Sequence, residues 1–440
     1  MKQRIKKILI NLLKLGVSVG AILWVLSKIS FKEVLGVFST ANIYYLIGAF
    51  ILLVISFIFS AFRQNLSFRN TGAHISQALN MAVNENVKVA GINDFYTTDG
   101  YKEWAKGCAE RKIFPLFNIE YISLNSSDQA AGIKVNDPNN PGRTYLSGKG
   151  LSFPPKLDEP YGSKLESVLH ETNLQVERMC SKLNEVLANM NAGFSLDYED
   201  IKSSMTKGMV RERHLAKALR KKVSESFVIT SEKQLFYKTV FGGKELKSDI
   251  EDFAATENEI RGNLLKAGGA AFIAESPEAF LDMEMVCSMI LESGGIPTYP
   301  FLADDSNGKF TDFEAPKETV IGILKERNIC SVEFITTRNS LAVLEEYAEY
   351  FRKNGFVVTF GSEHNTPAME PIELFARKST PLSSLLVEIN YEGACITAAH
   401  QYLVATEGIG YVDSDGKPDL TKREYFSTLG KALIEYITKV

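Results

Sequence analysis

The chain has few of the residues that most often build metal and redox sites, with five cysteines and five histidines among 440 residues. The cysteines lie far apart and form no Cys-x-x-Cys pair, so the sequence indicates neither a zinc ribbon nor a disulfide framework. The sequence also lacks Gly-x-Gly-x-x-Gly, Walker, Gly-x-Ser-x-Gly and His-Glu-x-x-His motifs. No motif therefore indicates a nucleotide-binding protein or a triad hydrolase. Scattered thiols in an odd number are typical of a reducing compartment.

Charge is distributed unevenly along the chain. Residues 1–70 carry nine Lys or Arg and a single acid, so their net charge is +8. Residues 71–440 therefore carry 40 basic and 52 acidic side chains, a net charge of −12. A segment this acidic is poorly suited to bind a phosphate backbone, so we expect no nucleic-acid partner.

The N-terminal segment contains two long apolar stretches. Residues 43–62 include no charged side chain, and as a helix they would extend about 30 Å, the thickness of the hydrocarbon core. Residues 8–27 are a weaker candidate because they include Asn11 and Lys14; a signal peptide is the alternative for them. We expect a transmembrane hairpin that contacts the lipid bilayer. Basic residues flank both of its ends, which places the rest of the chain in the cytoplasm, at the cytoplasmic membrane.

Beyond residue 72, apolar strands alternate with amphipathic helices. This order is typical of parallel β/α units, in a barrel or in a doubly wound sheet. Polar residues follow several of the strands, and in β/α barrels this is the end where active sites form. The predicted strands are 87–92, 113–117, 296–302, 329–335 and 356–360, and the predicted helices are 75–85, 104–111, 275–292 and 340–353.

Two segments interrupt this pattern. Residues 136–156 are rich in Asn, Gly and Pro and predict a long loop, which is either solvated or a lid that presents Arg143 and Lys149 to an anionic group. Residues 157–223 predict a helical insertion. Its basic run, 211–222, is interpreted as a solvated helix face, with apposition to an anionic membrane surface as the alternative.

Two parts of the sequence resemble known families. The N-terminal stretch, through SAFRQNLSFRNTG (60–72), resembles the start of the flippase-like membrane family related to lysylphosphatidylglycerol synthases. Residues 74–405 resemble the polymerase and histidinol phosphatase (PHP) family. Four segments carry the second resemblance: GINDFYTTDGY (91–101), FPLFNIEYISL (114–124), ESGGIPTYPFLAD (292–304) and FVVTFGSEHNTP (356–367).

The PHP resemblance implies a distorted seven-stranded β/α barrel that hydrolyses phosphate esters with up to three bound metals. Asp94 matches the aspartate of the second motif, Glu120 matches a metal-bridging glutamate, and Glu363 and His364 match the late motif. These four residues are the implied ligands of zinc, manganese or iron, since mixed nitrogen and oxygen ligands suit those metals. Arg143 and Lys149 are the expected phosphate contacts.

The match to the PHP pattern is incomplete. Phe95, Tyr96 and Tyr299 stand where the family has metal ligands, and the His-x-His of its first motif is missing. We therefore expect a barrel that is incomplete at its N-terminal strand, which would leave neighbouring strand edges uncovered unless another segment fills the gap.

These observations predict a mixed α/β chain in three parts. Residues 1–72 form the transmembrane hairpin, 73–405 the barrel with its insertion at 157–223, and 406–440 a C-terminal extension. The expected function is that of a membrane-tethered metal-dependent phosphoesterase acting on a small phosphate ester. The alternatives are a non-catalytic domain that binds a ligand or partner at the membrane face, and a remnant that does not fold.

Overall fold

The computed structural model describes residues 75–155, 157–206, 208–362 and 370–439. Among those residues, none of the helices combines the length and the apolar character needed to cross a bilayer. The two predicted membrane spans, residues 8–27 and 43–62, lie outside the described part of the chain.

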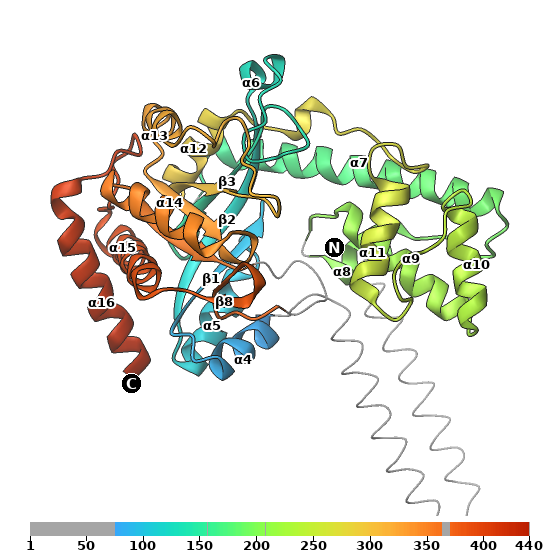
Figure 1. Ribbon diagram of the computed structural model, residues 1–440, viewed down its shortest axis with the longest axis horizontal. Coiled ribbons are helices and arrows are strands. Elements are labelled where there is room, and N and C mark those ends of the chain that lie inside the picture. Colours follow the sequence, from blue (N-terminus) through green and yellow to red (C-terminus); the bar gives the residue numbers. More distant parts are fainter. Residues whose placement is uncertain (1–74, 156, 207, 363–369, 440) are drawn as a thin grey trace, which may run out of the picture. The chain divides into compact units, whose positions relative to one another are not determined.

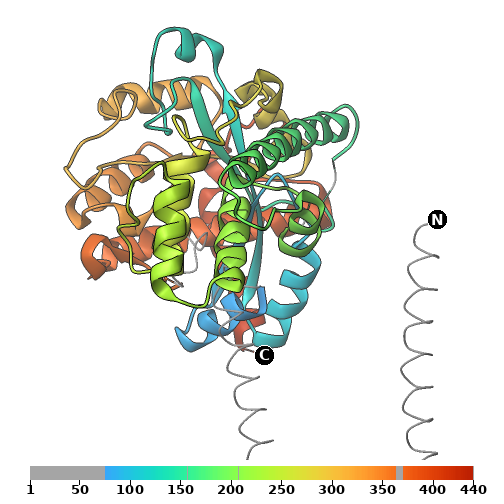
Figure 2. The same ribbon diagram turned by 90° about the vertical axis from the view of Figure 1, so that its right-hand side faces the viewer.

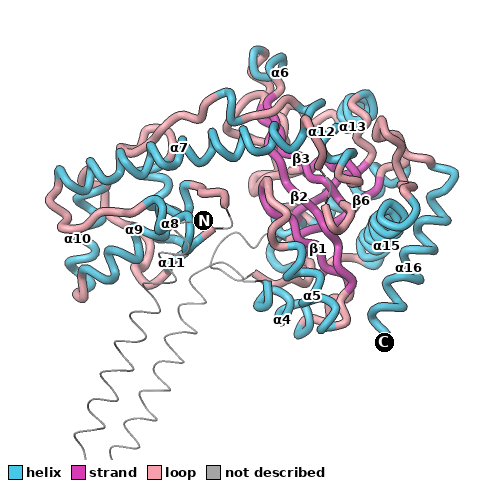
Figure 3. The backbone as a smooth tube through the Cα atoms, turned by 180° about the vertical axis from the view of Figure 1, so that it is seen from behind, coloured by secondary structure: helices cyan, strands magenta, loops and turns pink. Residues whose placement is uncertain are grey.

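A curled six-stranded sheet in the order β1-β2-β3-β4-β5-β6 forms the centre of the β/α body (Figures 1 and 3). Antiparallel pairs join β3 to β2 and to β4, and the other neighbours are parallel. The mixed α/β prediction is confirmed. The described strands form an open half-barrel rather than a closed seven-stranded barrel, because β1 and β6 remain at opposite ends of the strand order. The strands are β1 Val89–Phe95, β2 Phe114–Leu124, β3 Arg143–Lys149, β4 Ile296–Phe301, β5 Ser331–Ile335 and β6 Val357–Gly361.

The prediction of a loop over residues 136–156 was wrong for its central part. Residues 143–149 form β3, which lies between β2 and β4. The preceding turn is held by Asn136, whose side chain accepts a hydrogen bond from the Tyr145 backbone N–H (2.7 Å) and donates to the carbonyl of Pro300 (2.9 Å). Strand formation therefore depends on pairing with two neighbours and not on the local sequence, which is rich in small and polar residues.

One face of the sheet is apolar and carries the helices. Side chains alternate between the two faces of a strand, and paired residues share a face. The apolar face includes Phe117, Tyr299 and Phe334, which belong to one large buried core with Trp104 of α5 and Phe351 of α14. The helices that contribute to this core include α4 Ile75–Asn84, α5 Tyr101–Arg111, α12 Met283–Glu292, α13 Lys317–Glu326 and α14 Leu341–Lys353.

Helix α15, Ser384–Glu407, covers part of the opposite face and the edge of β6. Asn390 accepts a hydrogen bond from the backbone N–H of Phe360 in β6 (2.8 Å), and Gln401 accepts one from Phe117 in β2 (2.9 Å). The helix therefore contacts both β6 and β2. Helix α16, Arg423–Lys439, packs beside it (Figure 1).

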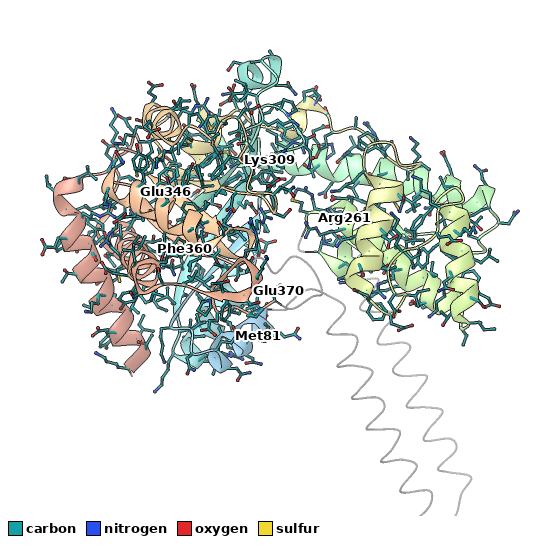
Figure 4. All side chains as sticks on the ribbon, in the orientation of Figure 1. Met81, Arg261, Lys309, Glu346, Phe360 and Glu370 are labelled. Atoms are coloured by element: carbon teal, nitrogen blue, oxygen red, sulfur yellow. The ribbon has the colours of Figure 1, made fainter. Side chains whose placement is uncertain are left out.

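A helical subdomain is inserted between β3 and β4, and Figure 2 views it from the front. It has its own buried core, which includes Leu183, Leu219 and Phe236. Its helices continue to Leu265, beyond the predicted boundary at residue 223, because α10 and α11 supply the other side of that core. Arg261, labelled in Figure 4, lies in this subdomain, whereas Glu346 and Phe360 lie in the β/α body. The helices are α7 Tyr161–Asn189, α8 Tyr198–Met205, α9 Glu212–Ser226, α10 Thr230–Val240, α11 Phe253–Ile260 and the π-helix η1 Arg261–Leu265.

The basic run 211–222 is not simply a solvated face. Arg220 is buried, donates to Glu257 (2.7 Å) and stacks on the Phe253 ring. Burial lowers the pKa of Lys217 to about 8. Several cations of this run are therefore part of the subdomain's interior.

The remaining elements are short. They are α6 Ser126–Ala130, β7 Phe375–Ala376, β8 Thr380–Pro381 and the 3-10 turns η2 Pro277–Ala279, η3 Thr336–Arg338, η4 Arg377–Ser379 and η5 Leu420–Lys422.

Candidate functional site

The second face of the sheet is polar, which is unusual for a face that is largely buried. Strand alternation and register place nine Asn, Ser, Thr, Glu and Lys side chains on it, and we call this set the polar face. Arg143 and Tyr145 of β3 share this side of the sheet near its rim. At the start of the strands the same face is apolar and packs on α15. The polar face consists of Asn93, Asn118, Glu120, Ser147, Lys149, Thr298, Ser331, Glu333 and Thr359.

A buried ion pair lies in the middle of the polar face. The Lys149 Nζ is 2.6 Å from Glu333 Oε1, and the two side chains are 6% and 11% exposed. Lys149 lies at the end of β3 and Glu333 within β5, and β4 separates the two strands. Lys149 therefore pairs with a carboxylate of the same chain. The lid that the sequence offered as one interpretation would instead have presented this side chain to an anionic ligand.

The predicted carboxylates Asp94 and Glu120 do not lie together. In the β1–β2 register, Glu120 pairs with Phe95, while Asp94 pairs with Ile119 on the apolar face. Asp94 is near the start of α5, where its Oδ2 would lie 3.4 Å from a Cβ added at Gly100. Its side chain remains accessible, although the surrounding protein raises the pKa of the carboxyl through partial desolvation. Glu120 is half-buried and faces the polar side.

Arg211 of the helical subdomain reaches the rim of the polar face. Its guanidinium stacks over the Phe95 ring, with 5.1 Å between the guanidinium carbon and the ring centroid. Phe95 in turn contacts the ring of Tyr145, which is on the same face as Glu120. Desolvation raises the pKa of the Tyr145 phenol; the charges of Asp137 and Glu120 raise it further, and that of Arg211 opposes them. Arg211 also lines a small cleft between the sheet and the subdomain, together with Tyr96, Gln175, Glu275 and Phe280.

Arg143, the other predicted phosphate contact, is held by acids. It forms an ion pair with Glu275, lies 3.8 Å from Asp137 and stacks over the Phe280 ring at 4.9 Å. These contacts lie at the border of the cleft that Arg211 lines, since Glu275 and Phe280 belong to both. Arg143 is therefore at the rim of the site, with its charge already compensated.

His400 is a buried histidine with both ring nitrogens hydrogen-bonded. Its Nδ1 accepts a hydrogen bond from the Tyr411 backbone N–H (2.9 Å), and its Nε2 lies 2.9 Å from the Gly294 carbonyl. Burial lowers the pKa of this histidine to about 4, so the ring is neutral and donates its Nε2 proton to Gly294. His170 is exposed on α7, and His214 accepts a hydrogen bond from the Arg211 N–H (2.9 Å) at the start of α9.

A second buried carboxyl, Glu314, lies beyond the end of β4. It accepts hydrogen bonds from the Tyr299 hydroxyl (2.9 Å) and from the backbone N–H groups of Leu302 and Ala303 (3.0 and 2.9 Å). Burial raises its pKa to about 8 despite these donors. Since Tyr299 stands where the resemblance has a histidine ligand, this position supports the strand end instead.

The described residues do not by themselves fit the metal centre that the resemblance implies. Asp94 faces away from Glu120, and Glu333 at the middle of the polar face is already paired with the Lys149 ammonium. The described part of the chain contains no group of three or more His, Cys, Asp or Glu residues placed to bind a metal. Glu363 and His364 lie outside the described residues. The four-residue metal site therefore stays a prediction.

Sequence reasoning missed Glu333, Asn118 and Arg211 as site residues. Glu333 is an acid within an otherwise apolar strand, and that was the available signal. Asn118 in β2 offered the same signal; its Oδ1 accepts a hydrogen bond from Gly150 N–H (3.1 Å). Nothing in the local sequence indicates that Arg211 contacts β1, because the two lie more than a hundred residues apart in the chain.

Comparisons with known proteins give only distant similarities. No family model matches the chain, and no curated protein matches it. One similar structure is an amidohydrolase from Chromobacterium violaceum with bound sulfate and no metal, which is 13% identical to this chain with a TM-score of 0.47. The match covers 72% of this chain and 91% of the amidohydrolase chain. A Bifidobacterium adolescentis protein assigned as a metal-dependent phosphoesterase is 13% identical with a TM-score of 0.45, covering 73% and 91%. Similarity at this level establishes neither a family nor an activity.

Proposed function

We propose that the β/α body is a hydrolase-like domain that binds a small phosphate ester at the rim of the polar face. The observation that supports this proposal is the polarity of a sheet face that an ordinary core would fill with apolar side chains. A buried polar surface is unfavourable unless its groups are satisfied, and part of this face remains accessible at Asn93, Glu120 and Thr359. Pockets with a few convergent polar groups are typical ligand sites.

In this proposal, Arg211 supplies the positive charge for the phosphate group. A guanidinium presents a fork of donors that matches phosphate oxygens, and stacking on Phe95 fixes its plane. Glu120 is the accessible carboxylate on the polar face and would accept a proton from an attacking water. Tyr145, between these two residues, would donate a hydrogen bond to the ligand.

The second candidate function is ligand binding without catalysis. The Lys149–Glu333 ion pair favours it, since this pair places a fixed ammonium and an already compensated carboxylate at the centre of the face. The two charges of the pair compensate each other, so it offers neither a free base nor a nucleophile. The two candidates share the binding site and differ only in turnover.

A panel of small phosphate esters tests both candidates with the full chain. Phosphate release and the shift in unfolding temperature are measured for wild type, Glu120→Gln and, as a control on an exposed site, Glu110→Gln. If the domain is a hydrolase, at least one ester stabilises the fold and is hydrolysed, and Glu120→Gln lowers turnover by about 100-fold or more while retaining the stabilisation. Stabilisation without release supports the binding function. If no ester has either effect on wild type, both candidates are wrong.

A further inference from the structure

Two acidic side chains lie near Arg211, and each of them is held by a different arginine. The Glu212 carboxylate accepts a hydrogen bond from Arg261 Nη2 at 2.8 Å, whereas its other oxygen lies 3.6 Å from Arg211 Nε. Glu275, which lines the same cleft as Arg211, forms its ion pair with Arg143. Both acids therefore make their shorter contact with another cation, and Arg211 has the longer contact with Glu212.

Arg261 lies at an irregular point of the helical subdomain. Helix α11 ends at Ile260 and continues directly into the π-helix η1, in which the Lys266 N–H donates to the Arg261 carbonyl (2.9 Å). This π-helix packs on α9, which begins at Glu212, and Asn258 accepts a hydrogen bond from Arg261 Nη1 (3.1 Å). Turns of this kind often occur at functional sites. Here the turn places the Arg261 guanidinium against the first turn of α9.

The cluster of Arg211, Glu212 and Arg261 has more positive than negative charge. Its side chains are 23%, 19% and 18% exposed, so all three charges are partly desolvated. Burial alone would raise the pKa of Glu212, but the charges of Arg211 and Arg261 lower it to about 2. Glu212 is therefore a carboxylate at neutral pH, and the two arginines share it. The net charge of these three residues is +1, which an anionic ligand would compensate.

We propose that Arg261 is a positioning residue that keeps Arg211 available for a phosphate group. By holding Glu212, Arg261 prevents this carboxylate from closing on Arg211 and cancelling its charge. The longer contact with Glu212 and the stack on Phe95 orient the guanidinium, whose terminal N–H groups then donate to phosphate oxygens. This inference rests on the proposed ligand site at Arg211 and adds that the interior of the helical subdomain controls the charge of that site.

The binding test uses the full chain and inorganic phosphate as the probe, with the dissociation constant measured by calorimetry at constant ionic strength. Arg261→Met should weaken phosphate binding by about tenfold or more, which is the contribution of one hydrogen bond between charged groups. Arg261→Gln, which retains a polar side chain beside Asn258, is a second removal variant and should have the same effect. Adding Glu212→Gln to either variant should restore most of the affinity, because the carboxylate that neutralises Arg211 is then absent. A residue that only supports the fold would not show this restoration.

Arg220→Met is the matched control. Arg220 lies on α9 and pairs with Glu257 at 2.7 Å in the interior of the same subdomain. Its replacement should destabilise the fold without changing the phosphate affinity of the folded chain. The proposal is overturned if Arg220→Met weakens binding as much as Arg261→Met does, if both Arg261 variants bind phosphate like wild type, or if Glu212→Gln restores nothing.

A measurement without phosphate separates this inference from the proposed function. Urea titration of Arg211→Met, Glu212→Gln and the double variant gives the coupling free energy between the two residues. This coupling should be larger in the Arg261→Met background than in wild type, since Glu212 then closes on Arg211. An unchanged coupling overturns the inference whatever phosphate does. If wild type binds no phosphate although the coupling increases, the failure lies with the proposed phosphate site, and the sharing of Glu212 is confirmed.

Discussion

The buried ion pair between Lys149 and Glu333 gives the sharpest stability prediction. Replacing Lys149 with Met removes the ammonium and leaves the Glu333 carboxylate buried without a counter-charge. Breaking one partner of a buried ion pair destabilises a protein by about 3–5 kcal/mol. Both side chains are nearly inaccessible and their atoms are 2.6 Å apart, so we expect a loss in that range in the free energy of unfolding from urea titration.

Two further variants separate this effect from general damage. Replacing both residues, as Lys149→Met with Glu333→Leu, removes the unpaired charge and should recover most of the lost stability. Lys353→Met breaks an exposed pair with Glu349, whose side chains are 65% and 43% exposed, and should change stability by less than about 1 kcal/mol. If Lys149→Met costs no more than Lys353→Met, the pair is not desolvated as the structure indicates, and the reasoning about the polar face fails.

Three other predictions concern pH, packing and location. Burial raises the pKa of Glu314 to about 8 in the folded chain. Its contribution to the free energy of unfolding is therefore complete below the unfolded pKa near 4.5 and is lost as the pH rises toward 8. In urea titrations across this window, the free energy of unfolding should decline less with pH in Glu314→Gln than in wild type. Gly430→Ala should destabilise the fold strongly, because an added Cβ would lie 1.8 Å from the Cys395 carbonyl oxygen where α16 meets α15. Gly322→Ala, at an exposed helix position with open space around it, should instead stabilise the fold by up to about 1 kcal/mol. Equal effects of the two substitutions on thermal unfolding would contradict this packing. The predicted spans should keep the full chain in the membrane pellet through a carbonate wash, and recovery in the supernatant would refute them.

Much of the β/α body could be predicted because its strands are short apolar runs. The runs at 296–302, 329–335 and 356–360 became β4, β5 and β6 with small changes at their ends. Strand β3, RTYLSGK, could not be recognised, since its second half contains Ser, Gly and Lys and the strand is held by two antiparallel neighbours. Contacts across the sheet override local preference at such a position.

The candidate site was less accessible to sequence reasoning than the fold. Asp94 and Glu120 were expected just beyond strands ending at residues 92 and 117, but both lie within the longer strands β1 and β2. The register that pairs Glu120 with Phe95 places Asp94 on the other face, and a shift of one residue would have reversed this. Lys149 was expected to be a free cation because its partner Glu333 lies 184 residues later in the chain. Residue types therefore indicated a polar site, while the pairing of charges within it required the three-dimensional arrangement.

The central claim is that the rim of the polar face binds a small phosphate ester through Arg211. The most direct measurement is the unfolding temperature of wild type, Arg211→Met and Arg211→Lys across the ester panel, with the exposed Lys222→Met as control. We predict that at least one ester stabilises wild type and Lys222→Met, by about 2.7 kcal/mol at a hundredfold excess over its Kd, with a smaller effect in Arg211→Lys and none in Arg211→Met. Equal stabilisation of Arg211→Met and wild type would contradict the account.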